Sequence, residues 1–522
     1  MKEKLKELFR DKISLSALIL SLFWFALYFG LGAPIFKNMW YTSPALPFVG
    51  GVLALAPLCI QLLNAFIFKK LTIDIIVLCI SPVFCFAHFC FFAFVISKLN
   101  YFFIAGKPYF ICAGLAGLLV FFIFFFPRLN LKLKRISATA ISAVFIIISL
   151  VCVFSAVPFY ISAGATVFAV EDEYQIAFAT SQKSVGAVIV NGRYYYDSTN
   201  GENNVRKLHK ITVPAEELDA SKSYTVFTQG VALNTAYLPS KGAKVSKDYT
   251  FRPIDTDDGI QIYNLSDTHE VIAGPARAGK FFGDKLDLLI LNGDIINDVS
   301  GEYQISLIYK LAHSITGGSH PVIFTRGNHE CNGYLAAELG KYVGCADNGF
   351  YYTFKIGTTL SLLILDTNND MSDNNPLVSP IANFDEVRTK QSEWLAEQKD
   401  INDCDYNFVV SHIAFPLSGY ISDSCHWNKW ARELTALTAG AQLAVCGHSH
   451  RTDFQFETDD NPIADYPVLR GSLRSNNRAY GEGVSPFEFT GAAIEIIDGN
   501  VNIKFTNAKK QVLGTHSLKV GL

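Results

Sequence analysis

Charged residues are scarce in this chain of 522 residues, and their scarcity is concentrated at one end. Asp, Glu, Lys and Arg make up 17% of the residues, against about a quarter in ordinary soluble proteins. Residues 1–162 hold nearly all the long apolar runs, whereas residues 163–522 have a soluble composition. The chain also lacks a basic stripe, and its formal net charge is −3. Nothing therefore predicts a nucleic-acid partner, and the length predicts more than one domain.

The apolar runs of residues 1–162 are long enough to cross a bilayer, which takes about 20 residues. A large buried helical domain is the alternative interpretation, but the run from Leu118 to Phe126 leaves no polar face to meet water. The sequence therefore predicts an α-helical membrane domain with five transmembrane helices. These lie near residues 13–33, 46–67, 72–97, 108–126 and 137–161.

Lys and Arg are distributed unevenly around these segments. They concentrate before the first segment and in the second and fourth connections. By the positive-inside rule the N-terminus is then cytoplasmic, and an odd number of spans places the rest of the chain outside the cytoplasm. We expect a multi-pass protein of the cell (plasma or inner) membrane, in contact with membrane lipids, with its catalytic part extracytoplasmic.

Residues 163–253 consist of short alternating runs separated by turns such as Asn191-Gly192 and Asn200-Gly201. Such runs predict a small β-sandwich. Their order resembles the fibronectin-III-like domain that precedes the catalytic domain of purple acid phosphatases. No residue in this stretch has an obvious chemical role, so we expect a spacer and docking surface.

Residues 254–522 contain short apolar runs that predict buried strands. Strands are predicted at 259–265, 288–292, 321–325, 408–410 and 443–446, and helices near 303–315, 333–342, 387–402 and 428–438. Each strand is followed by Asp, Asn or His, at the end where α/β sheets keep their ligands. These blocks are Asp267-Thr268-His269, Gly293-Asp294, Gly327-Asn328-His329-Glu330, Ser411-His412 and Gly447-His448-Ser449-His450.

The residue types in these blocks suit metal binding. Carboxylate, amide and imidazole groups are ligands of divalent metals, and one carboxylate can bridge two ions. Asp267 and His269, two residues apart on an extended segment, would point the same way. The glycines before Asp294, Asn328 and His448 would allow sharp turns and close backbone approach.

The order D-x-H, G-D, G-N-H-E, H, G-H-x-H resembles that of the calcineurin-like metallophosphoesterases, over about residues 258–510. The resemblance implies an α/β four-layer domain, a β-sandwich flanked by helices, with two divalent metal ions (Mn, Fe or Zn) as cofactors. Carried over by position, one metal would be held by Asp267, His269 and His450. The other would be held by Asn328, His412 and His448, and Asp294 would bridge the two.

The same resemblance implies hydrolysis of a phosphate ester by a hydroxide shared between the metals. Asp294 and Asn328 would take part, the latter holding non-bridging oxygens. His329 would protonate the leaving group, oriented by a carboxylate that we leave open between Glu330 and Asp298. His426 and Arg451 are weaker candidates for contacts with substrate.

One departure from the purple acid phosphatases concerns the metal site. Their G-D-x-x-Y block supplies a tyrosinate that binds ferric iron, and Asn297 stands at that position here. We therefore expect a colourless site.

The sequence as a whole predicts a membrane-anchored, extracytoplasmic, dinuclear-metal-dependent phosphoesterase. Two alternatives stay open. One is a hydrolase of lipid-linked or lipid head-group phosphates, with the membrane domain presenting its substrate. The other is a catalytically inactive binding or sensor protein.

Overall fold

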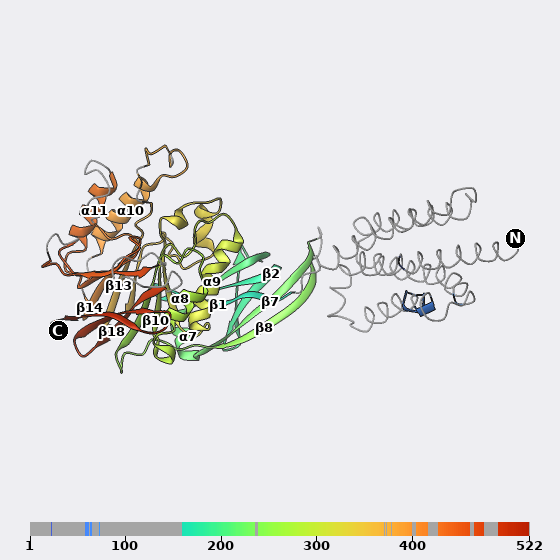
Figure 1. Ribbon diagram of the computed structural model, residues 1–522. Helices are drawn as coiled ribbons and strands as arrows, with labels where there is room; N and C mark the ends of the chain where they lie inside the picture. Colours follow the sequence, from blue (N-terminus) through green and yellow to red (C-terminus); the bar gives the residue numbers. More distant parts are fainter. Residues whose placement is uncertain are drawn as a thin grey trace, which may run out of the picture. The chain divides into compact units, whose positions relative to one another are not determined.

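The computed structural model describes most of residues 159–520 and few residues before them. The described residues are 22, 58–61, 63, 64, 73, 159–234, 239–369, 371, 373–376, 378–398, 403–415, 426–459, 464–473 and 489–520. The chain divides into two compact units, one of residues 1–158 and 230–243 and the other of residues 159–229 and 244–522. The second unit contains the predicted catalytic part and is described by itself (Figure 1).

The first sheet of this unit has a parallel centre. Strands β9, β10 and β11 lie side by side in that order, with Leu265 opposite Leu291 and Asn292 opposite Thr325. Antiparallel strands β18, β19 and β20 continue the sheet beyond β9. The bounds are β9 Ile260–Leu265, β10 Leu288–Asn292, β11 Pro321–Thr325, β18 Thr490–Ile497, β19 Asn500–Asn507 and β20 Val512–Lys519. The parallel pairing puts three carboxyl ends at one edge.

The second sheet has the same organisation. Strands β13, β14, β15 and β17 are parallel neighbours, and β12 and β16 pair antiparallel at its ends. The bounds are β12 Tyr352–Ile356, β13 Leu360–Leu365, β14 Tyr406–Ser411, β15 Leu443–Cys446, β16 Thr452–Gln455 and β17 Val468–Leu473. Strand β17 also pairs with β18, which joins the two sheets.

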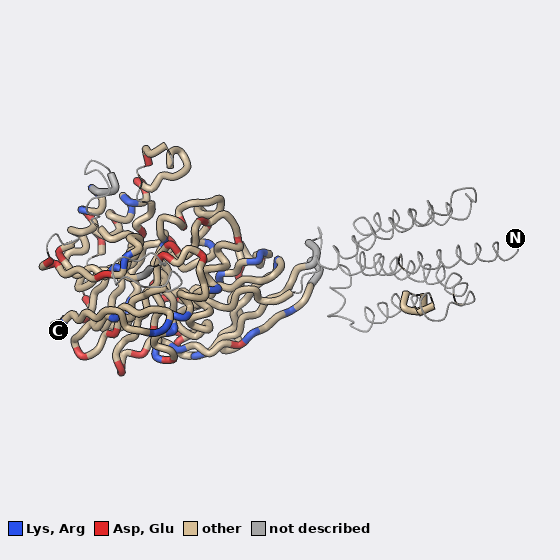
Figure 2. The backbone as a smooth tube through the Cα atoms, in the orientation of Figure 1, with Lys and Arg blue, Asp and Glu red and all other residues tan. Residues whose placement is uncertain are grey.

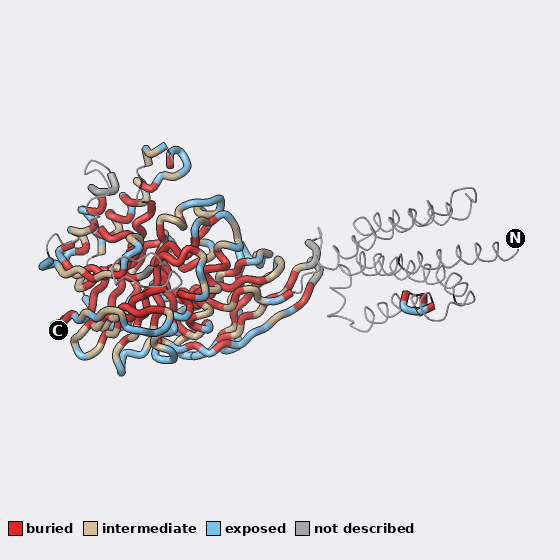
Figure 3. Tube along the Cα trace, viewed as in Figure 1, coloured by how far each residue is buried: buried red, intermediate tan, exposed pale blue. Residues whose placement is uncertain are grey.

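Both faces of the central strands are covered, which explains why their sequences are continuously apolar. Leu362 and Ile364 of β13 belong to the main hydrophobic core, whereas Leu363 and Leu365 belong to a second cluster with helices α10 and α11. Helices α8 and α9 contact the first sheet (Figure 1). Figure 3 shows that buried residues run through the middle of the second unit. The helices are α8 Ala273–Gly279, α9 Glu302–Thr316, α10 Phe384–Glu397 and α11 His426–Leu437. The described fold is thus a mostly β, α/β fold.

Apart from a separate two-stranded sheet within residues 198–203, the strands of residues 161–250 extend the first sheet. Strand β1 pairs in parallel with β11, with Phe168 opposite Val322, and antiparallel with β2. The elements are β1 Ile161–Val170, β2 Glu173–Val190, β3 Arg193–Tyr196, β4 Ser198–Thr199, β5 Glu202–Asn203, β6 Arg206–Pro214, α7 Ala215–Ser221, β7 Ser223–Asn234 and β8 Pro239–Thr250. The prediction of a separate β-sandwich in this stretch is wrong. An alternating sequence predicts a strand, but it does not predict the strand with which that strand pairs. The predicted domain bounds stay a prediction.

The prediction of a membrane domain with five transmembrane helices is also wrong. Among the described residues, no helix combines the length and the apolar character that a membrane span requires. The predicted segments between residues 13 and 161 lie, apart from a few residues, outside the described part of the chain. The prediction rested on apolar runs, which indicate a preference for leaving water but not a position in a bilayer. The structure supports the α/β fold alone.

Other local predictions can be compared directly. The strands predicted at 321–325 and 443–446 coincide with β11 and β15, and those at 259–265 and 288–292 agree with β9 and β10 within one residue. These predictions are confirmed. The helix predicted near 333–342 is instead a 3₁₀ helix, Ala336–Lys341. The backbone before it hydrogen-bonds to a neighbouring loop, from Leu335 N–H to the Val299 carbonyl at 2.9 Å.

Candidate metal centre

The loops that follow the parallel strands are hydrogen-bonded to one another. Asp267 N–H donates to the Gly293 carbonyl (3.1 Å), and His269 N–H donates to the Asp294 carbonyl (3.0 Å), so the loops after β9 and β10 run together. Gly447 N–H donates to the His412 carbonyl (2.8 Å), which joins the loops after β14 and β15. His448 N–H donates to Asp267 Oδ2 (3.1 Å) and connects the two pairs. The predicted blocks therefore converge.

Several of the predicted ligands have left-handed backbone conformations, which non-glycine residues rarely adopt. The φ angles are 54° at Asp267, 46° at His269, 52° at Asp294, 65° at His448 and 49° at His450. The prediction that Asp267 and His269 lie on an extended segment is wrong, because tight turns bring the two side chains together. Strained residues of this kind cluster at functional sites.

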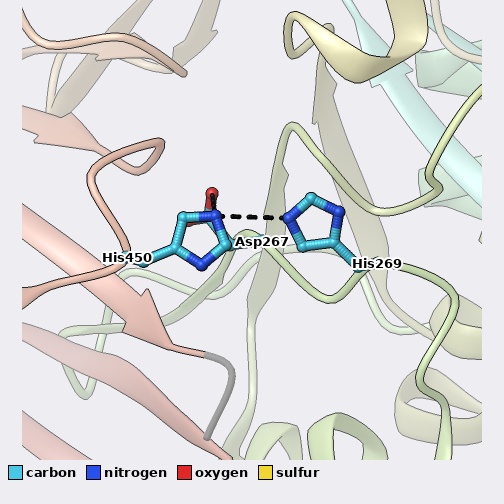
Figure 4. A group of neighbouring side chains, drawn as sticks. All are labelled: Asp267, His269 and His450. Carbon is cyan, nitrogen blue, oxygen red and sulfur yellow. Dashed lines mark hydrogen bonds and ion pairs between the residues drawn. The ribbon is translucent and has the colours of Figure 1, made fainter. Parts of the chain in front are cut away.

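One group of predicted ligands consists of Asp267, His269 and His450. Their ligand atoms all lie within 4.8 Å of one another. His450 Nε2 is 3.3 Å from His269 Nε2 and 3.6 Å from Asp267 Oδ1 (Figure 4). Asp267 Oδ2 accepts a hydrogen bond from Ser266 Oγ (2.6 Å). Asp267 Oδ1 is buried and has no hydrogen-bond partner among the described residues, so it is available to a cation.

A second group consists of Asp294, His412 and His448, again with ligand atoms within 4.8 Å. His412 Nδ1 donates to the Asn292 carbonyl (2.7 Å), which directs Nε2 toward Asp294 Oδ2 at 3.2 Å. That contact is an ion pair without hydrogen-bond geometry, and Nε2 is a buried atom that has no hydrogen-bond partner in the described part of the chain. Asn328 joins this group, because its Oδ1 is 3.0 Å from His448 Nδ1.

Asp294 lies between the two groups. Its Oδ1 accepts the His329 N–H (3.0 Å), which leaves Oδ2 facing His412. Asp294 also forms a third set with His269 and His329, within the same 4.8 Å. Asp294 therefore has predicted ligands of both groups beside it, as a carboxylate that bridges two metals would.

The electrostatics of the site favour positive charge between the carboxylates. Burial lowers the pKa of His412, but the neighbouring Asp294 carboxylate outweighs burial and raises this pKa to about 10. Burial lowers the pKa of His269 to about 4, and burial with the charge of His412 lowers that of His448 to about 3. Both of these imidazoles are neutral at pH 7, the form that binds metals. The neutral imidazoles of His269 and His448 and the buried Asp267 Oδ1, which accepts no hydrogen bond from the described residues, fit divalent cations.

His329 is oriented by a group that the sequence did not predict. Its Nδ1 is 2.8 Å from the Asn297 carbonyl, and its Nε2 is 3.9 Å from Asp294 Oδ2. Asn297 also places its side-chain Oδ1 3.2 Å from His269 Nδ1. Neither of the proposed carboxylates orients His329, since Glu330 accepts backbone N–H groups of residues 294–296 and 327, and Asp298 accepts the Ser300 N–H.

The weaker candidates are not brought into the site by a described contact. Arg451 is exposed, and His426 is the first residue of α11, with its side chain outside the described part of the structure. Two further residues of the site are not predicted from the sequence: Asn292, whose carbonyl orients His412, and Ser266, which holds Asp267. Ser266 directly precedes Asp267 and Asn292 lies two residues before Asp294, and this closeness to predicted ligands is the signal in the sequence that could have found them.

The solvent exposure of these side chains increases from the bottom of the site to its opening. Those of Asp267 and His412 are fully buried and that of Asp294 is 2% exposed, whereas those of His329 and His450 are 38% and 44% exposed. A ligand from solvent therefore meets the two exposed histidines first. Lys and Arg are interspersed with Asp and Glu along the backbone of the second unit (Figure 2).

Comparison with known proteins identifies the domain. Residues 260–452 match the family described as calcineurin-like phosphoesterase. No curated protein matches the sequence significantly. The chain is similar to purple acid phosphatase from yellow lupin (Lupinus luteus) seeds, with 12% identity, a TM-score of 0.46 and coverage of 68% of this chain and 74% of that one. It is also similar to PhoD, with 12% identity, a TM-score of 0.41 and coverage of 68% and 90%.

These TM-scores lie below 0.5, so the conclusion rests on the family match and not on the solved structures. The matched region runs from the start of β9 to the start of β16 and contains every block described above. Members of this family use divalent metals, and the Asp and His groups around Asp294 have the residue types to bind them. Residues 260–452 of the chain are thus a calcineurin-like phosphoesterase domain, and the protein is a hydrolase of phosphate esters.

Proposed function

We propose that the chain hydrolyses phosphate esters at a dinuclear centre of divalent metals built around Asp294. The observation that carries this proposal is the pair of ligand groups that meet there, each with a buried atom that has no hydrogen bond within the described protein, Asp267 Oδ1 and His412 Nε2. One metal would be held by Asp267, His269 and His450, and the other by Asn328, His412 and His448. When bound, divalent metals would lower the pKa of water and offset the charge of the phosphoryl group.

The residues of the chain supply orientation and proton transfer. The hydrogen bond of His412 Nδ1 to the Asn292 carbonyl fixes the ring and leaves Nε2 as the ligand atom. His329 is more exposed than the floor of the site, and its contact with the Asn297 carbonyl holds the ring with Nε2 toward Asp294. In its protonated form, His329 would keep the Nδ1–H on that carbonyl and donate the Nε2–H to the departing oxygen.

The substrate class and the cellular location remain predictions. The size of the apolar part, residues 1–162, is the ground for a lipid-linked substrate, and the distribution of Lys and Arg around its segments is the ground for an extracytoplasmic location; no described residue supports either. A decisive assay therefore offers soluble phosphomonoesters, phosphodiesters and lipid phosphates side by side.

The experiment uses the purified full chain with Mn²⁺, Fe²⁺ or Zn²⁺ added after chelation. The matched control is Asp294→Asn, which keeps the size of the side chain and removes its charge. We expect at least one phosphate ester to be hydrolysed by the metal-loaded wild type, with no activity in the chelated protein or in the variant. Equal turnover by wild type and Asp294→Asn would refute the proposal.

A further inference from the structure

The turn that carries Asp294 is strained and buried. Gly293 and Asp294 both have left-handed conformations, with φ of 74° and 52°. Successive residues in turns of this kind direct their N–H groups toward one point and form an anion-binding concavity. Ile295 and Ile296, which follow, are 1% and 0% exposed. Their N–H groups cannot reach water and need acceptors within the protein.

The acceptor for all of these groups is the Glu330 carboxylate, which is itself fully buried. Oε2 accepts the N–H groups of Asp294 (2.8 Å) and Gly327 (2.9 Å). Oε1 accepts those of Ile295 (2.8 Å) and Ile296 (3.1 Å). One side chain from the loop after β11 therefore satisfies four backbone donors in two loops.

The same segment also restrains the Asp294 side chain. The N–H of His329, the residue before Glu330, donates to Asp294 Oδ1. Gly327 packs tightly against the carboxylates of Asp294 and Glu330, because a Cβ at this position would lie 2.3 Å from Asp294 Oδ1 and 2.9 Å from Glu330 Oε2. With its backbone and Oδ1 both held, Asp294 presents Oδ2 to His412 Nε2 at 3.2 Å.

We propose that Glu330 is a positioning residue that sets the direction of Asp294 Oδ2 by holding the Gly293–Ile296 turn. It acts through Asp294, because His329 takes its orientation from the Asn297 carbonyl instead. The inference rests on the proposed function to the extent that Asp294 is taken as a metal ligand. Residues that orient ligands typically contribute 10–100-fold to metal affinity, so the role is measurable without turnover.

The test compares Glu330→Gln with wild type by calorimetric titration of the full, metal-free chain with Mn²⁺. An amide in place of one oxygen turns an N–H₂ group toward backbone N–H donors, so the turn relaxes. We expect Mn²⁺ affinity to fall by about 10–100-fold while circular dichroism shows a folded protein. The matched control is Glu338→Gln, because Glu338 is exposed and paired only with Lys341 among the described residues. It should bind Mn²⁺ like wild type.

Activity gives a second readout that a purely structural role would not produce. Added Mn²⁺ should restore the turnover of Glu330→Gln, whereas it should not restore His329→Ala. If Glu330→Gln does not fold, Glu330→Asp replaces it, since the shorter carboxylate keeps the charge but cannot reach all four donors. A folded variant of either kind with wild-type Mn²⁺ affinity would overturn the inference.

The inference and the proposed function can fail separately. If wild type binds Mn²⁺ and Glu330→Gln binds it weakly, but neither hydrolyses any phosphate ester, the positioning role stands and the proposed function fails. If wild type is active and Glu330→Gln keeps its affinity for Mn²⁺, only the positioning role fails.

Discussion

Replacement of His329 by alanine separates proton donation from metal binding. The side chain is 38% exposed, so its truncation leaves no buried cavity. The variant loses the contact of Nδ1 with the Asn297 carbonyl (2.8 Å), which belongs to an exposed group, and we expect its stability to stay within about 0.5 kcal/mol of wild type. Any large effect on turnover would then come from chemistry.

The size of that effect depends on the leaving group. A general acid contributes about 100–10,000-fold, or about 2.7–5.4 kcal/mol of transition-state stabilisation. An alkyl phosphate, whose alkoxide needs a proton as it departs, should show this full loss in kcat. An aryl phosphate with an acidic phenol should lose much less, because the phenolate departs unaided.

The assay measures kcat and KM for the two esters with wild type and His329→Ala at saturating Mn²⁺, and Mn²⁺ affinity by titration. His329 Nε2 is 3.9 Å from Asp294 Oδ2 and belongs to one of the possible ligand sets, so the titration is an essential control. An equal loss on both esters would refute the role in proton donation. A loss of Mn²⁺ binding would instead make His329 a ligand.

Three further predictions concern the turn before Asp294, the carboxylate of Asp197 and the colour of the protein. Gly293→Ala should destabilise the protein by more than about 1 kcal/mol and weaken metal binding, because φ at this position is 74° and a Cβ would lie 2.5 Å from His412 Nδ1. Urea unfolding and Mn²⁺ titration measure the two effects, and wild-type affinity for Mn²⁺ would contradict the prediction. Burial raises the pKa of Asp197, but hydrogen bonds from His209 and Arg206 outweigh burial and lower it. Its contribution is then present above the unfolded pKa of about 3.9 and lost as pH falls through the lower folded value. Urea unfolding should therefore show Asp197→Asn to be about 1–3 kcal/mol less stable than wild type at pH 7, with a smaller difference at pH 3; a difference that does not shrink would oppose this. Freshly purified protein should show no visible charge-transfer band, since Asn297 replaces the tyrosine of the purple enzymes; a coloured protein would refute this.

The strands that position the site could be predicted because their local chemistry is unambiguous. Leu288 to Leu291 are buried on both faces, so the run is continuously apolar and ends where polar Asn292 and Asp294 begin. The same reasoning applies to β11 and β15. Each such run reveals a strand and its carboxyl end without knowledge of its partners.

The remaining features depend on contacts between distant residues. The pairing of β1 with β11 joins residues about 150 positions apart, and no local pattern specifies it. The left-handed turns at Asp267 and Asp294 are held by hydrogen bonds to other loops. For the same reason Glu330 could be predicted as a polar neighbour of the site, but its four backbone donors could not.

The central claim is that Asp294 lies between two divalent metal ions. Anomalous diffraction from crystals of the full chain soaked in Mn²⁺ tests it most directly. The account predicts two peaks, one beside Asp267, His269 and His450 and the other beside Asn328, His412 and His448, with Asp294 between them. A single peak, or peaks that Asp294 does not contact, would contradict it.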